Sequence, residues 1–180
     1  MKLAFISDTH GGYEDTIEVL EGLKDAKQIY HIGDVLYHGP RNDLPKSYNP
    51  KELANLLKSR TDIVYVRGNC DADVDEMVLG HDLSLKSRLV EFDGYRFYLL
   101  HGYQETEEER IQQAKELGCQ VLVSGHTHIK QLEEKDGIIV LNPGSTTIPK
   151  DGSRSYAYYQ NGELILFDLD QQKVIKKLTL

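Results

Sequence analysis

The sequence has few cysteines and no long apolar run, and both absences narrow the class of protein. Only Cys70 and Cys119 occur in 180 residues, without CxxC spacing and without the number needed for a disulfide framework. Such cysteine usage is typical of a reducing compartment, and the apolar run at residues 3–6 is too short for a signal-peptide core. No stretch approaches the roughly 18 apolar residues of a membrane span. We therefore expect a soluble, cytoplasmic protein without membrane contact.

Positive charge is also scarce. The chain has 21 Lys and Arg against 29 Asp and Glu, a formal net charge of −8. This balance excludes a polybasic membrane anchor and argues against binding of a nucleic-acid duplex, which needs a basic stripe to displace counterions. It also raises a question for any anionic substrate, because an acidic protein should repel it unless positive charge lies in the site.

Length and composition are those of one folded domain. With 39% hydrophobic and 28% charged residues the chain is too apolar for disorder, and a chain of this size buries roughly 70% of its unfolded surface. No repeat, low-complexity tract or linker divides it. We therefore expect a single domain over residues 1–180.

The first half of the chain alternates predicted strands with predicted helices. Short apolar runs predict buried strands at residues 3–6, 28–32 and 62–66. One helix is expected from Asp15, and a second from Asn49-Pro50, where an N-cap residue precedes a proline in the first turn.

The second half consists mostly of predicted hairpins. Asp93-Gly94, Asp136-Gly137 and Asn161-Gly162 each separate two apolar runs, which is a strong hairpin signal. A polar helix is expected from about Thr106 to Leu117, and a further strand at 121–123. The hairpin strands are expected at residues 85–92, 95–100, 130–133, 138–141, 156–159 and 163–168. Helices over both outer faces of two packed sheets accommodate both halves, so the fold class is α/β (α+β).

Side chains that can bind metal ions follow these strands. The set comprises Asp8, His10, Asp34, Asn69, His101, His126 and His128. In open α/β sheets, sites gather at the carboxyl ends of strands. Mixed imidazole and carboxylate ligation suits manganese, iron, zinc or nickel better than calcium. Seven such ligands are enough for two divalent ions.

No fragment of this set is specific by itself. Asp-x-His is a common loop sequence, and a single histidine such as His101 after an apolar strand is more often a core residue than a ligand. The order of the motifs is the stronger signal. Each follows an apolar strand in turn: Asp8-x-His10, Gly33-Asp34, Gly68-Asn69, His101-Gly102 and Gly125-His126-Thr127-His128.

This ordered series resembles the calcineurin-like metallophosphoesterase superfamily, whose pattern is D-x-H, G-D, G-N-H, H and G-H-x-H. The similarity runs from residue 3 to about residue 149. The segments GNCD (68–71), HGPRN (38–42) and NPGS (142–145) further resemble the small bacterial and archaeal YfcE-type phosphodiesterases. The resemblance implies a metallo-dependent phosphatase-like fold, a four-layer αββα sandwich of two mixed sheets.

The resemblance also implies roles for the ligands. Asp8, His10 and His128 would hold one ion, and Asn69, His101 and His126 the other. Asp34 would bridge both, a role that needs the two oxygens and the charge of a carboxylate. Manganese is expected first, with nickel, cobalt, iron and zinc as alternatives. The implied activity is phosphodiester hydrolysis by in-line attack of a metal-bridging hydroxide, on a small phosphate ester, by a chain that forms a dimer or tetramer.

The sequence departs from the superfamily at Cys70, where many members carry a histidine that assists the transition state or the leaving group. A thiol is a weaker acid-base partner at neutral pH than imidazole, so we expect good leaving groups to be preferred. The alternative for Cys70 is a small hydrophobic side chain that only packs beside the site. The residues expected to take part in catalysis are Asp34, Asn69, Cys70 and Asp71.

The loop at residues 37–49 is the predicted substrate contact. His38 and Arg41 could reach phosphate oxygens together with Asn69, since arginine offers them a planar fork of donors. The alternative is a solvated loop shaped by its prolines.

Two other functions stay open at this point. One is a phosphomonoesterase or nucleotide phosphatase on the same site. The other is a protein-binding scaffold of the kind found in a eukaryotic retromer subunit with this fold, which has lost part of the ligand set. Retention of all seven ligand positions favours catalysis.

Overall fold

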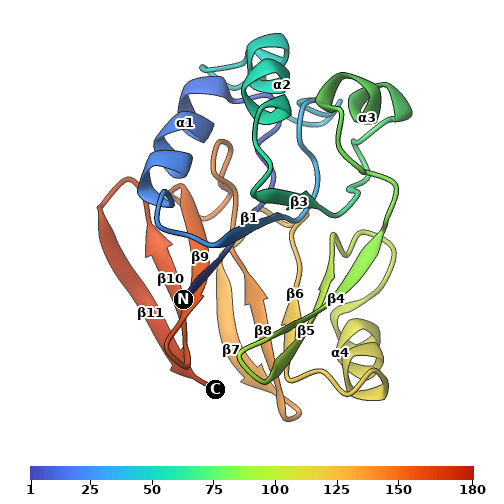
Figure 1. Ribbon diagram of the computed structural model, residues 1–180, viewed down its shortest axis with the longest axis vertical. Coiled ribbons are helices and arrows are strands. Elements are labelled where there is room, and N and C mark those ends of the chain that lie inside the picture. Colours follow the sequence, from blue (N-terminus) through green and yellow to red (C-terminus); the bar gives the residue numbers. More distant parts are fainter.

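Two mixed β-sheets pack face to face in the computed structural model, which describes residues 1–180 (Figure 1). The first sheet contains, in spatial order, β11 (Lys173–Thr179), β10 (Glu163–Asp168), β9 (Ser155–Gln160), β1 (Lys2–Ile6), β2 (Gln28–His31) and β3 (Ile63–Tyr65). The second contains β4 (Ser87–Phe92), β5 (Tyr95–Leu100), β6 (Val121–Val123), β8 (Ile138–Asn142) and β7 (Gln131–Lys135). Strands β1, β2 and β3 are parallel, as are β5, β6 and β8, and the other neighbours are antiparallel.

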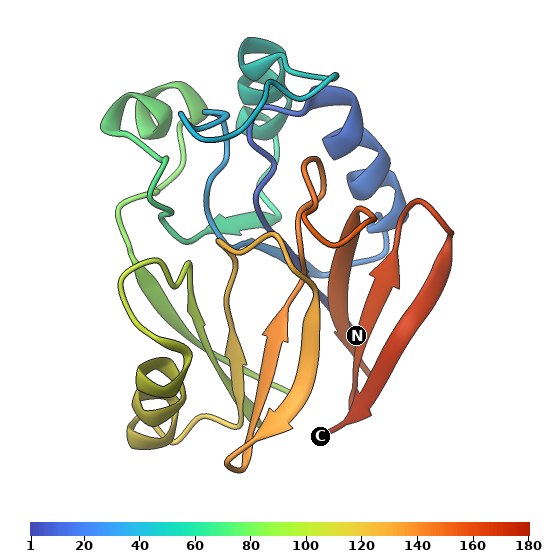
Figure 2. The same ribbon diagram turned by 180° about the vertical axis from the view of Figure 1, so that it is seen from behind.

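Helices cover the two outer faces (Figures 1 and 2). On the first sheet lie α1 (Tyr13–Gly22), α2 (Pro50–Lys58) and α3 (Asp73–Leu79), and on the second lies α4 (Glu107–Glu116). None of the four is long and apolar enough to cross a membrane. The architecture is the expected αββα sandwich of two mixed sheets.

Strand β1 shows how the sequence builds these layers. Side chains alternate along a strand, so Ala4 and Ile6 contact the helices α1 and α2 while Leu3 and Phe5 point toward the second sheet. Both faces of β1 are therefore covered, and every residue after its first is buried. This explains why β1 reads in the sequence as one continuous apolar run rather than an alternating one.

The turn and cap signals of the sequence are confirmed. Asn49 accepts a hydrogen bond from the Glu52 N–H at the start of α2, and Thr106 forms a capping box with Glu109 at the start of α4. In the three predicted hairpin turns both central residues have positive φ, as a type I′ turn requires. These turns are Asp93-Gly94, Asp136-Gly137 and Asn161-Gly162.

Two elements were not expected. Helix α3 buries only Asp75 and Leu79, and its other apolar residues are exposed, so it has no periodic apolar face to reveal it. Strand β11 lies at the edge of its sheet, paired only with β10, and almost all its side chains are exposed. Neither segment therefore carries the apolar periodicity on which strand and helix prediction depends.

Loss of a side chain from the layer between the sheets should destabilise the whole sandwich. Leu141 of β8 is fully buried there, so Leu141→Ala is expected to lower the free energy of unfolding by about 2–5 kcal/mol, measured by urea denaturation. Met77→Ala is the control, because Met77 is 78% exposed and its truncation should change stability by less than about 0.5 kcal/mol. Equal losses in the two variants would contradict this packing.

Candidate metal centre

The predicted ligands gather at the carboxyl ends of strands from both sheets. Two groups of predicted ligands form, each with its ligand atoms within 4.8 Å of one another, and a third set of this kind joins His10 and Asp34 with Cys70. One group is Asp8, His10 and His128, and the other is Asp34, His101 and His126. These groups follow the division that the family resemblance implies, with the amide of Asn69 beside them.

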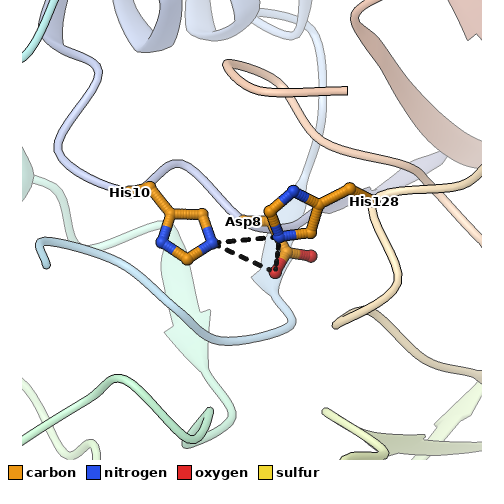
Figure 3. Close-up of side chains that lie close together, drawn as sticks. All are labelled: Asp8, His10 and His128. Atoms are coloured by element: carbon orange, nitrogen blue, oxygen red, sulfur yellow. Dashed lines mark hydrogen bonds and ion pairs between the residues drawn. The ribbon is translucent and has the colours of Figure 1, made fainter. Parts of the chain in front are cut away.

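In the first group, three acceptor atoms converge on one point (Figure 3). His10 Nε2 lies 3.1 Å from His128 Nε2. Asp8 Oδ1 lies 3.2 Å from His128 Nε2 and 3.6 Å from His10 Nε2. Asp8, His10 and His128 are all buried, so water does not separate these atoms from one another.

The other ring nitrogens fix the tautomer of the two histidines in this group. His10 Nδ1 lies 2.8 Å from the Tyr37 carbonyl and His128 Nδ1 lies 2.8 Å from the Ile148 carbonyl. A carbonyl only accepts, so both Nδ1 atoms must donate, and both neutral rings then present an Nε2 lone pair. Two lone pairs at 3.1 Å require a positive charge between them, which is either a proton or a metal ion. The residues therefore fit a metal ion, in the usual arrangement where a ligating histidine donates its second N–H to a carbonyl.

The second group is built in the same way. His101 Nδ1 donates to the Ile32 carbonyl at 2.6 Å, and its Nε2 lies 3.2 Å from Asp34 Oδ2 without the alignment of a hydrogen bond. The half-buried ring of His126 meets the ring of His101 edge to face, with 5.3 Å between centroids. The same Asp34 Oδ2 lies 3.7 Å from His10 Nε2 in the first group, so this carboxylate stands between the two groups.

Each carboxylate has one oxygen fixed by the protein and the other turned to the histidines. Asp8 Oδ2 accepts from the Ser7 hydroxyl at 2.6 Å and from the His126 N–H at 3.1 Å, while its buried Oδ1 has no hydrogen-bond partner. Asp34 Oδ1 accepts from the Cys70 N–H at 2.8 Å. A buried acceptor without a donor is costly, and a bound cation would satisfy it.

The Asp34 carboxylate can hold its position only because residue 68 is glycine. A Cβ at Gly68 would lie 2.2 Å from Asp34 Oδ1 and 2.5 Å from the Asp34 backbone nitrogen. Real atoms do not approach so closely, so any side chain here would displace the Asp34 turn. The Gly68-Asn69 signal in the sequence thus has a steric cause.

The backbone of the ligands is itself unusual. Five of them have φ in the left-handed region, which L-residues rarely adopt, although Asp, Asn and His tolerate it best. They are Asp8 (56°), His10 (43°), Asp34 (59°), His126 (69°) and His128 (58°). Such conformations cost of order 1–3 kcal/mol each and persist where the surrounding structure enforces them. The left-handed turns aim the side chains back across the strand ends.

The charges in the site shift each other's pKa values in the metal-free chain. Burial alone would raise the pKa of Asp8, but the neighbouring imidazoles of His10, His101 and His128 hold it well below the usual range. Burial alone would lower the pKa of His101, but the Asp34 and Asp8 carboxylates raise it to about 9. The pKa of His10 is raised in the same way by Asp8. At neutral pH, the proton on His101 therefore lies where a cation would fit.

Asp71, predicted to be catalytic, has its carboxylate turned to the backbone. Its two oxygens accept from the N–H groups of Asp34 (2.9 Å), Val35 (2.8 Å) and Gly68 (2.7 Å). Burial raises the pKa of Asp71, and these hydrogen bonds oppose the rise. This geometry suits a positioning residue, which joins the turn after β2 to the turn after β3.

A cavity of about 490 Å³ opens over the two groups. Asn69 and Cys70 line it, and the Asn69 amide donates to Cys70 Sγ at 3.5 Å. Cys70 Sγ also lies within 4.8 Å of a ligand atom of His10 and of Asp34. All four residues predicted to be catalytic thus border this cavity.

The predicted substrate contacts are only partly brought together. Arg41 is exposed and lines the cavity, as Asn69 does. His38 is not among the lining residues, because its ring packs edge to face against Tyr37 (4.7 Å between centroids) and Tyr48 (5.3 Å). In the structure, the His38 ring therefore packs within its own loop and does not line the site cavity.

Lys150 lines the cavity and was not predicted from the sequence. Its N–H donates to the His128 carbonyl at 3.0 Å, which fixes this part of the chain beside a ligand. A lysine in a Pro-Lys-Asp-Gly loop is an ordinary surface pattern, so no local signal distinguishes it. Only the approach of residues 145–150 to the ligand loops gives it a place in the site.

The chain matches known proteins along its whole length. Residues 1–162 match the model of the calcineurin-like phosphoesterase superfamily domain. Phosphodiesterase YfcE of Escherichia coli (strain K12) is 37% identical over 184 residues, which cover 100% of this chain and 98% of that protein. A probable metallophosphoesterase of Mycoplasma pneumoniae is 30% identical and covers 87% of this chain and 86% of its own length.

Solved structures agree with these matches. The structure of the Escherichia coli phosphoesterase YfcE superposes with a TM-score of 0.90 at 36% identity, with 99% of each chain covered. Vacuolar protein sorting 29 from Cryptosporidium parvum superposes with a TM-score of 0.69 at 21% identity, over 99% of this chain and 98% of its own. That second likeness concerns the fold alone.

Metal binding should release a proton, because a metal ion must displace the one held on His101. With the pKa of His101 raised to about 9, its imidazole is protonated below that pH, so apparent metal affinity should rise with pH up to about 9. The expected gain is about tenfold or more per pH unit. Titration calorimetry with Mn²⁺ at pH 6.5, 7.5 and 8.5, in buffers of different ionisation enthalpy, measures both affinity and proton release. An affinity independent of pH, with no proton release, would contradict this account of the site.

Proposed function

The chain belongs to the calcineurin-like phosphoesterase superfamily and is a metal-dependent phosphodiesterase, and we propose that it hydrolyses small phosphodiesters at a centre of two divalent metal ions. The observation that best supports this is the pair of ligand groups with Asp34 between them. One carboxylate oxygen lies near the imidazoles of both groups, which is the arrangement a bridging ligand needs.

The ligand assignment follows the two groups. Asp8, His10 and His128 hold one ion, His101 and His126 hold the other with the amide oxygen of Asn69, and Asp34 contributes to both. Manganese is the proposed ion, and nickel, cobalt, iron and zinc suit the same nitrogen and oxygen donors. When bound, the ions supply Lewis-acid charge that lowers the pKa of water and neutralises phosphate oxygens during in-line displacement.

The protein's own groups orient the ester. Asn69 and Arg41 border the cavity from the loops after β3 and β2. The guanidinium of Arg41 offers paired donors for two phosphate oxygens, and it is free to turn because it forms no ion pair. Asp71 keeps the two loops in register through the backbone of Asp34 and Gly68.

Cys70 limits proton transfer to the leaving group. Burial, with the neighbouring Asp34 charge, raises the pKa of the Cys70 thiol to about 12 in the metal-free chain. A group with so high a pKa is a poor general acid at neutral pH. Esters whose leaving group departs without a proton, such as aryl esters, are therefore the better substrates.

The proposal also covers the compartment, the oligomeric state and two alternative functions. The chain is proposed to act in the cytoplasm, as a dimer or tetramer, on small esters rather than on a nucleic-acid duplex. A phosphomonoesterase activity would use the same two ligand groups. A scaffold function on this fold, by contrast, would not need the ligands, and here all seven positions keep ligating side chains.

Loss of the shared carboxylate should abolish turnover. Asp34→Asn keeps the size of the side chain and removes its charge, so hydrolysis of bis(4-nitrophenyl) phosphate with Mn²⁺ should fall by about two to three orders of magnitude in kcat. Asp25→Asn is the matched control, because Asp25 is an exposed partner of Lys2, and it should keep wild-type kcat. Retained activity in Asp34→Asn would contradict the bridging role. Metal binding without hydrolysis of either this diester or 4-nitrophenyl phosphate, in the wild type, would favour the scaffold.

A histidine at position 70 should widen the range of leaving groups. Cys70→His supplies an imidazole with a pKa near neutrality, so the rate on alkyl diesters should rise by about tenfold or more relative to aryl diesters. The measurement is the ratio of kcat/KM for an alkyl and an aryl diester in wild type and variant, with Cys70→Ser as the variant of similar size that lacks an imidazole. An unchanged ratio would show that Cys70 only packs.

A further inference from the structure

A second cavity, called here the outer cavity, borders the site cavity. It measures about 600 Å³ and shares three lining residues with the site cavity: Arg41, Asn42 and Lys150. An apolar cavity on the other side, between α2 and α3, shares only Tyr37 with it. The site cavity thus shares more lining residues with the outer cavity than with the apolar one. A substrate too large for the site cavity would therefore extend into the outer cavity.

The outer cavity has an excess of positive charge. Arg41, Lys46 and Lys150 line it, and none of the three forms an ion pair. The cavity also contains Arg154, but this guanidinium is neutralised by Asp15 at 2.6 Å and by two further carboxylates.

Asp43 is the one carboxylate of the outer cavity left to oppose the three free cations. The lining side chains therefore carry four cations against two carboxylates, Asp15 and Asp43, while Glu18 and Asp170, which also pair with Arg154, lie outside the lining. In an acidic protein this local excess would favour an anion at this place over the rest of the surface.

Hydrogen bonds hold the backbone around Lys150 against the loops that carry the metal ligands. Ser145 Oγ donates to the Asp8 carbonyl at 2.7 Å and accepts from the Ile148 N–H at 2.9 Å. Ile148 in turn accepts from His128 Nδ1, and the Lys150 N–H donates to the His128 carbonyl. The backbone that carries Lys150 is thus held at a set place relative to Asp8 and His128.

We propose that the outer cavity binds a second anionic group, a phosphate or a carboxylate, carried by the ester group that stays on the phosphate during hydrolysis. The preferred substrates are then small phosphodiesters with a further negative charge, oriented by Lys46 and Lys150. This inference rests on the proposed phosphodiesterase activity and names its substrate class.

The test uses three diesters with the same 4-nitrophenyl leaving group. Their second ester group is ethyl (neutral), 2-carboxyethyl (anionic) or 2-(trimethylammonio)ethyl (cationic), so only the distal charge differs. With Mn²⁺ at low ionic strength, kcat/KM should be about tenfold higher for the anionic than for the neutral ester, and lower still for the cationic one. The preference should shrink at 0.5 M salt, because exposed charges are screened.

Variants locate the effect. Lys46→Gln and Lys150→Gln should each lower the ratio of anionic to neutral kcat/KM by about threefold or more, through KM. Lys27→Gln is the matched control, since Lys27 is another exposed lysine without an ion pair, next to β2 and outside both cavities, and it should leave the ratio unchanged.

The outcomes separate this inference from the function on which it rests. Turnover of all three esters at equal kcat/KM, or a preference untouched by both lysine variants, would overturn the anion subsite and leave the phosphodiesterase in place. Absence of metal-dependent hydrolysis of all three esters would overturn the proposed function and the subsite with it.

Discussion

The centre of this molecule depends on one electrostatic constraint: buried acceptor atoms face one another and need positive charge among them. The carbonyls of Tyr37, Ile148 and Ile32 each accept a hydrogen bond from the Nδ1–H of a ligand histidine. This leaves the three Nε2 atoms close to two carboxylates, at the buried floor of the site cavity. Protons can meet the need in the metal-free chain, and a divalent ion meets it better because several ligands share its charge. The loops that supply the carbonyls are therefore as much a part of the site as the ligands.

The net negative charge of the chain does not describe the charge at the site, because positive charge is concentrated there. Of the seven proposed ligands only Asp8 and Asp34 are charged, so two divalent ions would leave the site positive, and bound cations are often the largest local charges in a site. The unpaired Arg41, Lys46 and Lys150 extend that region outward. A chain with a net charge of −8 can therefore attract a small phosphate ester at one opening while its remaining surface repels long polyanions.

Much of the fold and most of the ligand set could be predicted from the sequence because both depend on local rules. Buried strands such as β1 are continuous apolar runs, the hairpin turns need Asp-Gly or Asn-Gly, and the ligands lie where strands end. Helix α3 and strand β11 were missed because neither has an apolar face. The position of Lys150 at the cavity was missed because it depends on residues 145–150 passing close to the ligand loops. The packing of His38 against Tyr37 and Tyr48 likewise depends on tertiary structure. Contacts of this kind leave no local trace.

The left-handed backbone at Asp8, His10, Asp34, His126 and His128 also limits which amino acids each position can hold, apart from any need for metal. Aspartate, asparagine, histidine and glycine tolerate that region, whereas β-branched and bulky residues do not. A relative that had lost catalytic activity but kept this fold would still tolerate only a few amino-acid types at these turns. Asparagine or glycine would be the residues to expect there, and valine or isoleucine would be found only where the turn itself had been rebuilt. The residues at the five turns are thus restricted by the backbone conformation as well as by the chemistry of the site.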